Sequence, residues 1–230
     1  MNIPLAFEII DTALYFKKNR LLICGDIHIG YEEALNKQGI LVPRNSFAEL
    51  MKRTETLLKK TQPEMIIILG DLKHEFGTIS ETEWRHTVRF LTLLQEYAKK
   101  ILLIKGNHDN ILEPIARTKN LEIAEEYVIN GMLFIHGNKI RERANDKKIK
   151  TIVIGHEHPA VTVTYWPRRE TYKALLVGTW KTKKLIVVPS FTTLTEGTDV
   201  LKERLISPYL NRKKILDFDC YILADKAYYF

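Results

Sequence analysis

Short apolar runs bounded by polar residues recur through the first half of the chain. They predict five strands, at 6–10, 13–17, 20–25, 66–69 and 101–104. The run from Ile66 to Leu69 contains only isoleucine and leucine. An uninterrupted apolar run of this kind is typical of a strand covered on both faces, so the first half predicts strands buried within a layered fold.

Two longer segments between these strands carry apolar residues at helical spacing. From Ser46 to Lys60 these residues recur every three or four positions, and Pro63 then prevents the helix from continuing. A second helix is predicted over 81–98, and Ser80 directly before it is a favourable N-cap. The first half therefore alternates strands with helices.

The second half changes to a series of strands. They are predicted at 126–130, 132–135, 151–155, 160–165, 173–179 and 184–188, with a final pair at 217–223 and 227–230. Asp225 and Lys226 are candidates for the turn that closes this pair. Helix-separated strands followed by meandering strands predict an α/β fold with mixed sheets and helices on the outer faces, built as one domain over 1–230.

Five of these predicted strands are followed by residues that can bind metals. The candidates are Asp26, His28, Asp71, Asn107, His108, Asp109, His136, His156 and His158. In open α/β sheets, ligands bind in the crevice outside the carboxyl ends of the strands. We therefore expect these side chains, which are far apart in sequence, to meet in space.

Each of these residues also has a structural explanation when it is considered alone. An Asp after a strand commonly forms a turn or caps a helix, and Asn-His-Asp can form an Asx turn. The joint pattern favours a site, because five of the seven histidines follow such strands and a sixth, His74, comes three residues after Asp71. Only His86, in the predicted second helix, stands apart.

The residue types indicate which metals fit. Carboxylate, imidazole and amide oxygen without thiolate suit divalent ions such as Mn, Fe, Zn, Ni or Co, of which we expect Mn. Seven candidate ligands exceed the number that one tetrahedral ion needs. We therefore expect two divalent metal ions, bridged by Asp71 because it stands alone at its strand end.

The ordered motifs resemble those of the calcineurin-like metallophosphoesterase superfamily. In chain order they are Asp26-Ile27-His28, Gly70-Asp71, Gly106-Asn107-His108-Asp109, His136-Gly137 and Gly155-His156-Glu157-His158. The resemblance spans residues 25–158. It implies a four-layer sandwich of two mixed β-sheets flanked by helices, with a dinuclear metal site.

The same resemblance implies roles for the individual residues. Asp26, His28, Asp71 and His158 would bind one metal, and Asp71, Asn107, His136 and His156 the other. His108 would lie beside the leaving oxygen, with Asp109 orienting its ring. The expected reaction is in-line attack on phosphorus by a hydroxide held between the cations, while His108 protonates the departing alkoxide.

Two further stretches, "GDLKHEFG" and "VVPSFTTLTEG", resemble a subgroup of small archaeal proteins and bacterial DNA-ligase-associated phosphoesterases. That subgroup is related to the repair exonuclease branch, which implies a nucleic acid or nucleotide phosphoester substrate and DNA-repair partners. In that branch a histidine three residues after the bridging Asp assists the substrate phosphate, and His74 matches it. The alternative is a structural His74 that bonds a loop carbonyl.

The chain leaves no room for the DNA-capping domain or coiled coil of the large repair exonucleases, so we expect a small Mn-dependent nuclease acting on single-stranded DNA or RNA. Tyr31, Trp166, Arg168 and Arg169 could stack bases and hold backbone phosphates, although core packing is an alternative for each. Two other functions stay open. The enzyme could hydrolyse small or cyclic nucleotides as a phosphodiesterase or phosphomonoesterase, or the chain could be a non-catalytic scaffold like retromer-type relatives of this fold.

Composition adds less to this picture. Among 230 residues, 35 Lys and Arg against 28 Asp and Glu give a net charge of +7, which suits a polyanionic substrate, but the basic pairs are scattered. Two distant cysteines predict neither a disulfide framework nor a zinc–thiolate site, and no run approaches the roughly 20 apolar residues of a membrane span. We expect a cytoplasmic protein without a membrane segment. The oligomeric state and the role of residues 190–216 stay open.

Overall fold

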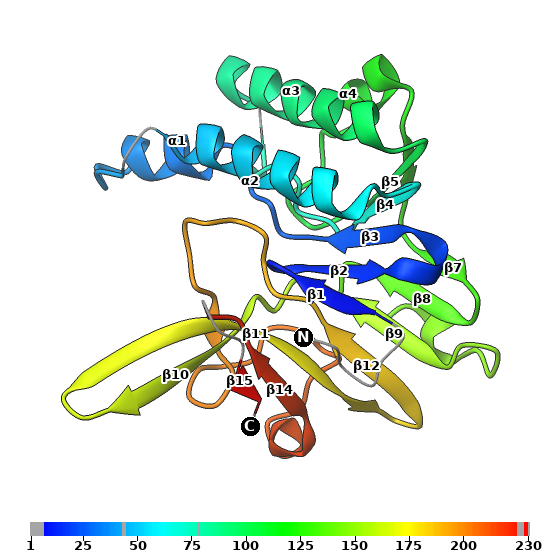
Figure 1. Ribbon diagram of the computed structural model, residues 1–230, viewed down its shortest axis with the longest axis vertical. Helices are drawn as coiled ribbons and strands as arrows, with labels where there is room; N and C mark the ends of the chain where they lie inside the picture. The colour runs from blue at the N-terminus through cyan, green and yellow to red at the C-terminus, as the bar shows by residue number, and fades with distance from the viewer. Residues whose placement is uncertain (1–6, 43–44, 78, 225–227, 230) are drawn as a thin grey trace.

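Two β-sheets lie face to face in the computed structural model, which describes residues 7–42, 45–77, 79–224 and 228–229 (Figure 1). Each sheet contains both parallel and antiparallel strand pairs. Helices cover the outer face of the first sheet (Figure 1). The predicted α/β class, with two mixed sheets flanked by helices, is confirmed.

The first sheet contains six strands in the order of the chain. They are β1 (Glu8–Ile10), β2 (Ala13–Phe16), β3 (Leu21–Cys24), β4 (Met65–Ile68), β5 (Lys100–Ile104) and β6 (Glu122–Ala124). The central strands β3, β4 and β5 are parallel, with Cys24 opposite Ile68 and Ile68 opposite Leu103. Their carboxyl ends therefore reach the same edge of the sheet. Residue 6 of the predicted first strand lies outside the described residues.

The alternation of side chains along the central strands explains why their sequences are apolar throughout. In β4, Ile66 and Ile68 pack against the helices, whereas Ile67 packs against the second sheet. All three are buried. The uninterrupted apolar run thus belongs to a strand covered on both faces, as predicted.

Four α-helices are described: α1 (Tyr31–Lys37), α2 (Ser46–Thr61), α3 (Glu81–Tyr97) and α4 (Glu113–Lys119). The helical spacing of α2 brings Leu57 and Leu58 onto the first sheet. Ser80 caps α3, because its Oγ accepts a hydrogen bond from Glu83 N at 3.1 Å. The two long predicted helices are confirmed, while the short elements α1, α4 and β6 were not predicted.

The second sheet contains the strands of the later half. They are β7 (Tyr127–Ile129), β8 (Met132–Ile135), β9 (Thr151–Ile154), β10 (Pro159–Tyr165), β11 (Arg168–Trp180), β12 (Lys183–Val187), β13 (Thr198–Asp199), β14 (Asp219–Ile222) and β15 (Tyr228–Tyr229). The strands predicted between 126 and 188 and at 217–223 are confirmed, whereas β13 was not predicted. Residues 227 and 230 of the predicted last strand lie outside the described residues. The hairpin of β10 and β11 is longer than predicted, because β11 begins at Arg168. The predicted turn at Asp225–Lys226 lies outside the described residues.

The outer face of the second sheet is covered by short 3₁₀ turns and loops. The turns η2 (Glu142–Asn145) and η3 (Ile215–Asp217) place Ala144 and Ile215 against it, together with Val200 and Tyr209 from the irregular chain between. Part of the region 190–216, whose role the sequence left open, therefore forms the fourth layer. A third turn, η1 (Lys17–Asn19), connects β2 and β3. None of the helices within the described ranges is both long and apolar enough to cross a membrane.

Candidate metal centre

The residues that follow five strands meet at one edge of the two sheets, as the sequence analysis expected. Asp26 and His28 follow β3, Asp71 follows β4, Asn107 to Asp109 follow β5, His136 follows β8, and His156 and His158 follow β9. Backbone hydrogen bonds join these loops. Asp26 N donates to Gly70 O at 3.0 Å, and Gly155 N donates to His136 O at 2.9 Å.

The backbone is strained at most of these positions. Five of the seven candidate metal ligands have a positive φ: Asp26 (54°), His28 (51°), Asp71 (50°), His156 (67°) and His158 (48°). Residues other than glycine rarely adopt this left-handed conformation, and such strain persists where the surrounding structure holds it, typically at functional sites.

Two glycines allow the loops to approach the carboxylates closely. A Cβ at Gly155 would lie 2.6 Å from Asp26 Oδ2, and a Cβ at Gly106 would collide with Asp71 Oδ1. In the absence of these side chains, Asp26 accepts a hydrogen bond from His156 N at 3.0 Å, and Asp71 accepts one from His108 N at 2.9 Å. Both carboxylates are thereby fixed in orientation.

The first cluster contains Asp26, His28 and His158, whose potential ligand atoms all lie within 4.8 Å of one another. His158 Nε2 lies 3.3 Å from Asp26 Oδ1 and 3.3 Å from His28 Nε2. Asp26 is 0% exposed. Burial is the main cause that lowers the pKa of His28 to about 3, so its ring is neutral, as metal ligation requires.

The second cluster contains Asp71, His136 and His156, whose potential ligand atoms also lie within 4.8 Å of one another. His136 Nδ1 donates to Leu69 O at 2.8 Å, which directs Nε2 toward the cluster. That Nε2 atom lies 3.0 Å from Asn107 Oδ1 and 3.1 Å from His156 Nδ1. Asn107 thus contributes an amide oxygen to this cluster.

Asp71 lies between the two clusters. Its Oδ2 is 3.4 Å from His136 Nε2 in the second cluster and 3.8 Å from His28 Nε2 in the first. Asp71 is buried. Asp26 Oδ1 also lies near a histidine of each cluster, at 3.3 Å from His158 Nε2 and 3.8 Å from His136 Nδ1, but this His136 nitrogen donates to Leu69 O. The Asp71 carboxylate is therefore within reach of both clusters through atoms that face them.

The donor set fits cations. In a neutral ring with Nδ1 protonated, His136 Nε2 carries a lone pair, and it faces the oxygens of Asn107 and Asp71. Such atoms repel unless positive charge lies among them. Burial alone would lower the pKa of His136, but the hydrogen bond and charge of Asp71 raise it to about 9. The field at this position therefore favours a positive charge, which a proton or a divalent ion can supply.

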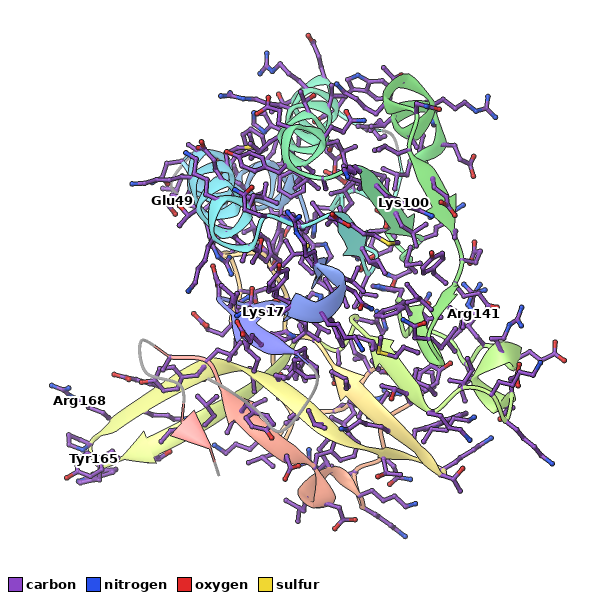
Figure 2. The ribbon with its side chains drawn as sticks, turned by 45° about the vertical axis from the view of Figure 1, so that its right-hand side comes forward. Lys17, Glu49, Lys100, Arg141, Tyr165 and Arg168 are labelled. Carbon is purple, nitrogen blue, oxygen red and sulfur yellow. The ribbon has the colours of Figure 1, made fainter. Side chains whose placement is uncertain are left out.

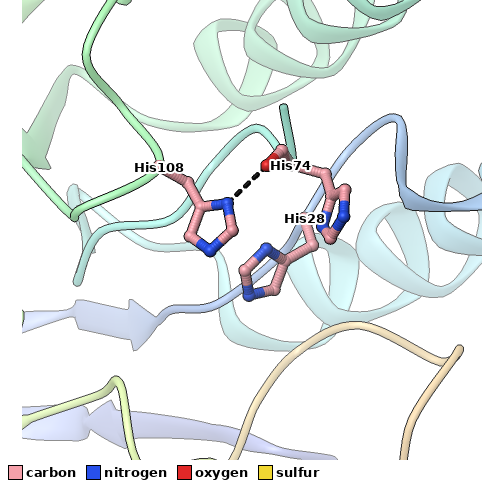
Figure 3. A group of neighbouring side chains, drawn as sticks. All are labelled: His28, His74 and His108. Carbon is pink, nitrogen blue, oxygen red and sulfur yellow. Dashed lines mark hydrogen bonds between the residues drawn. The ribbon is translucent and has the colours of Figure 1, made fainter. Parts of the chain in front are cut away.

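Three imidazole rings, those of His28, His74 and His108, form a third group (Figure 3), which shares His28 with the first cluster. His108 Nδ1 donates a hydrogen bond to the backbone oxygen of His74 (Figure 3). The opposite nitrogen, His108 Nε2, lies 3.9 Å from Asp71 Oδ2. Within the described chain, His28 Nδ1 and His74 Nδ1 are buried without a hydrogen-bond partner. These rings can donate hydrogen bonds to anionic oxygens.

Asp109 has a different role from the expected one. The resemblance implied that Asp109 orients the His108 ring, but that ring is bonded to the His74 carbonyl instead. The Asp109 carboxylate accepts hydrogen bonds from Gly106 N at 3.0 Å and Leu72 N at 3.1 Å. Burial is the main cause that raises the pKa of Asp109 to about 6. Asp109 therefore ties the loop after β5 to the loop after β4.

Glu83 and Phe76 were missed by the sequence analysis. Glu83 is 0% exposed, and its Oε1 accepts hydrogen bonds from His74 N at 2.9 Å and Glu75 N at 3.0 Å. Ser80-x-x-Glu83 has the capping-box pattern, yet the Glu83 side chain holds the His74 loop. Phe76 packs on the His108 ring with centroids 3.6 Å apart. Neither contact leaves a signal in local sequence.

The predicted substrate residues fall into two groups. Tyr31 stacks on His74 with centroids 4.2 Å apart, next to the centre. Trp166, Arg168 and Arg169 lie at the tip of the β10–β11 hairpin, whose end is marked by Tyr165 and Arg168 in Figure 2. At roughly 3.3 Å per residue, β10 carries this tip about 23 Å from His158. The structure does not bring the hairpin residues to the centre.

Comparison with known proteins identifies the family. The calcineurin-like phosphoesterase family matches residues 19–176, more than half of the chain. The chain therefore belongs to the calcineurin-like phosphoesterases, a family of enzymes that bind divalent metals. The search of curated proteins found no match.

Three solved structures are similar to this chain to different degrees. The crystal structure of nuclease MPE from Pseudomonas putida is similar with a TM-score of 0.68 and 19% identity, over 96% of this chain and 92% of that chain. Yfce, a phosphoesterase from E. coli, has a TM-score of 0.44 and 13% identity over 89% of this chain and 88% of that chain. A Vps29 double mutant from Entamoeba histolytica has a TM-score of 0.37 and 12% identity, over 91% of this chain and 98% of that chain. Only the similarity to nuclease MPE supports the fold, and at 19% identity it concerns the fold alone.

Proposed function

We propose that the chain hydrolyses phosphodiester bonds with two divalent cations, as a small nuclease acting on single-stranded DNA or RNA. The observation that carries this proposal is the position of Asp71 between two clusters of buried acid and histidine side chains. Two cations held a few ångströms apart can stabilise both the attacking and the leaving oxygen of an in-line displacement.

Each cation has its own set of residues in this proposal. Asp26, His28 and His158 would hold one, Asn107, His136 and His156 the other, and Asp71 would be shared. When bound, the cations neutralise charge on the phosphoryl oxygens and lower the pKa of water. The buried carboxylates balance the cation charge, and the strained backbone holds the ligands in place before binding.

His108 is the residue that moves a proton. Its Nδ1 is engaged by the His74 carbonyl, so only Nε2 is available toward the centre. A protonated His108 Nε2 would donate to the leaving oxygen as the phosphorus–oxygen bond breaks. His74 would contribute its own ring N–H to a phosphate oxygen, and Glu83 positions it through its backbone.

A single-stranded nucleic acid fits the surface beyond the centre. Tyr31 lies next to the metal-binding residues, while Trp166 is 88% exposed at the hairpin tip beside Arg168 and Arg169. Exposed aromatic rings stack on bases, and arginines pair with backbone phosphates. The similarity of the whole fold to a nuclease, over more than nine-tenths of each chain, supports the proposed nuclease function.

Small nucleotide esters are a second candidate substrate. A cavity of about 420 Å³ opens beside His28, and its size lies in the range of small-molecule sites, roughly 300–1,000 Å³. A nucleotide could therefore be bound without any contact to the hairpin.

Manganese, a cytoplasmic location and DNA-repair partners belong to the same proposal. The donor set of carboxylate, imidazole and amide oxygen suits Mn, and both cysteines are free, which suits a reducing compartment. Metal analysis after expression in medium with balanced Mn, Fe, Zn, Ni and Co would test the ion. Recovery of two equivalents of another metal would contradict manganese.

The deciding experiment compares four substrates under one Mn²⁺ condition: single-stranded DNA, single-stranded RNA, duplex DNA and bis(4-nitrophenyl) phosphate. The nuclease proposal expects the highest kcat/KM on a single strand. Equal or higher efficiency on the small diester would favour the second candidate. A protein that binds two cations and hydrolyses none of the four would contradict both.

A further inference from the structure

A cavity of about 420 Å³ lies between α1, the beginning of α2, α3 and the loop at 192–194. Its lining includes Tyr31, Asn36, Phe47, His86 and Thr193. None of these residues belongs to the metal clusters. The cavity is therefore a separate binding volume next to the centre.

The cavity shares a wall with the metal centre. His28 lines it and also belongs to the first cluster, where its Nε2 lies 3.3 Å from His158 Nε2. On the opposite side, Thr192 lines the cavity and its backbone N–H donates to Asp26 O at 3.1 Å. A group bound here would therefore be adjacent to a phosphate at the cations, as a nucleoside is adjacent to its own phosphate.

The side walls are suited to a planar guest. Phe47 and His86 are stacked in parallel, with centroids 3.8 Å apart and 1° between their planes. At the end near the centre, Tyr31 is stacked on His74. Both pairs are built from flat rings, and Leu50 and Ile29 add apolar surface. A flat heterocycle can pack against such rings by stacking or edge contacts.

The charges of the lining disfavour a second phosphate and suit a neutral guest with N–H groups. Two carboxylates, Glu32 and Glu33, face the one lysine of the described lining, Lys37, whose Nζ is paired with Glu33 Oε1 at 3.4 Å. Glu32 Oε2 accepts from Ser46 N at 2.9 Å, and Glu33 Oε2 accepts from Ser80 Oγ at 2.9 Å, so both carboxylates are held at the cavity. Carboxylate oxygens only accept hydrogen bonds. Asn36 Nδ2 donates to Glu32 O at 2.8 Å, which leaves the Asn36 amide oxygen as a further acceptor. Bases with exocyclic amino groups complement these acceptors.

We propose that this cavity binds the nucleoside of the nucleotide whose phosphate is held at the metal centre. The inference rests on the proposed function for the position of the phosphate. It adds that the enzyme recognises a base directly beside the bond it breaks. The shared chemistry is a nucleoside monophosphate unit, either free or within a strand.

The first test compares AMP with ribose 5-phosphate as inhibitors of Mn²⁺-dependent bis(4-nitrophenyl) phosphate hydrolysis. Both present a phosphate and a ribose, and only AMP has a base. Because stacking of one base is a sizeable contribution to affinity, AMP should have an inhibition constant about tenfold lower. Equal inhibition constants would overturn the inference while leaving the proposed function intact. Absence of hydrolysis itself would instead count against the proposed function.

Two variants test whether the tighter inhibition by AMP arises in this cavity. Thr193→Trp fills the cavity from its exposed rim, and Phe47→Ala removes one ring of the stacked pair. Each should remove the tenfold advantage of AMP and leave ribose 5-phosphate inhibition and metal content unchanged. Thr182→Trp, in the exposed turn between β11 and β12, is the matched control and should retain the advantage. An advantage that persists in Thr193→Trp protein with normal metal content would overturn the inference, even if Phe47→Ala fails to fold.

One further experiment distinguishes whether the cavity binds a base within a strand or a free nucleotide. A single-stranded oligonucleotide with one abasic position should lose the cut next to that position in the wild type, while Thr193→Trp cuts all positions evenly. That result assigns the cavity to bases within a strand. Unchanged cutting of the abasic strand together with the AMP advantage assigns it to free nucleotides.

Discussion

The metal centre and the tip of the β10–β11 hairpin are opposite in character, although both are proposed to contact the substrate. Asp26 in the centre is 0% exposed, whereas Trp166 at the tip is 88% exposed. The centre is built from residues of five strand ends with strained backbone, and the tip from one continuous hairpin. Chemistry on a phosphate requires fixed geometry, while holding a flexible strand requires only accessible rings and charges.

The metal centre also contains features that are unfavourable for folding, whereas the hairpin tip does not. Buried carboxylates and left-handed backbone in the centre are unfavourable by themselves, and opposite charge must compensate them. None of residues 165–169 at the tip has a left-handed backbone, and the tip is exposed. Substitutions there should therefore leave the stability of the fold unchanged. This contrast predicts large, metal-linked effects at the centre and modest, substrate-dependent effects at the hairpin.

The largest effect is expected for Asp71→Ala. Loss of the carboxylate between the clusters should abolish binding of both cations and lower kcat/KM on every substrate by roughly 1,000-fold or more. Metal analysis of the purified protein and the diester assay measure the two effects. Asp217→Ala, which removes an exposed acid of η3, is the control. Two cations still bound to Asp71→Ala protein would reject the bridging role.

His108→Ala should keep both cations and lower turnover by about 10²–10⁴-fold. The loss should be greatest for poor leaving groups such as nucleoside alkoxides and smallest for 4-nitrophenolate, because the missing proton matters most for a basic leaving oxygen. Rates on a series of diesters with different leaving groups, together with metal content, check this. A collapse of metal binding, or an equal loss across the series, would contradict the role of His108.

Combined replacement of Trp166, Arg168 and Arg169 by Ala should raise KM for a long single strand about tenfold. Hydrolysis of bis(4-nitrophenyl) phosphate should not change, since that diester cannot span about 23 Å from the centre to the tip. The salt dependence of strand binding should also weaken. Lys213→Ala with Lys214→Ala, two exposed bases elsewhere, is the charge control. Equal effects on both substrates would remove the distinction between centre and tip.

The smallest effect is expected for Glu83→Gln. The amide retains an oxygen that can accept from His74 N and Glu75 N, so activity should change by about twofold or less, with normal metal content. Glu83→Ala leaves both buried N–H groups without this acceptor and should lower the free energy of unfolding by about 2 kcal/mol or more. Denaturant unfolding and the diester assay measure the pair. A large loss of activity in Glu83→Gln would mean that the charge, and not the geometry, supports His74.

Strand ends were predictable because their signals are local. The apolar run Ile66–Leu69 followed by Asp71 indicates both a buried strand and a polar residue at its end, and the same reasoning applies to Asp26 and His136. The role of Asp109 was not predictable. Its carboxylate is close to His108 in sequence, yet it bonds backbone N–H groups of another loop, and that loop's position depends on strand pairing.

The sequence by itself determined most of the strands, the two long helices and the set of side chains able to bind cations, because apolar periodicity and residue chemistry are local properties. Only the tertiary structure decided how those side chains divide into two clusters, with Asp71 between them. It also decided that the hairpin tip lies far from the centre, whereas Phe47 and His86, from two different helices, meet in one cavity beside it. These relations depend on which strands and helices pack together, and that is set by burial of the whole core.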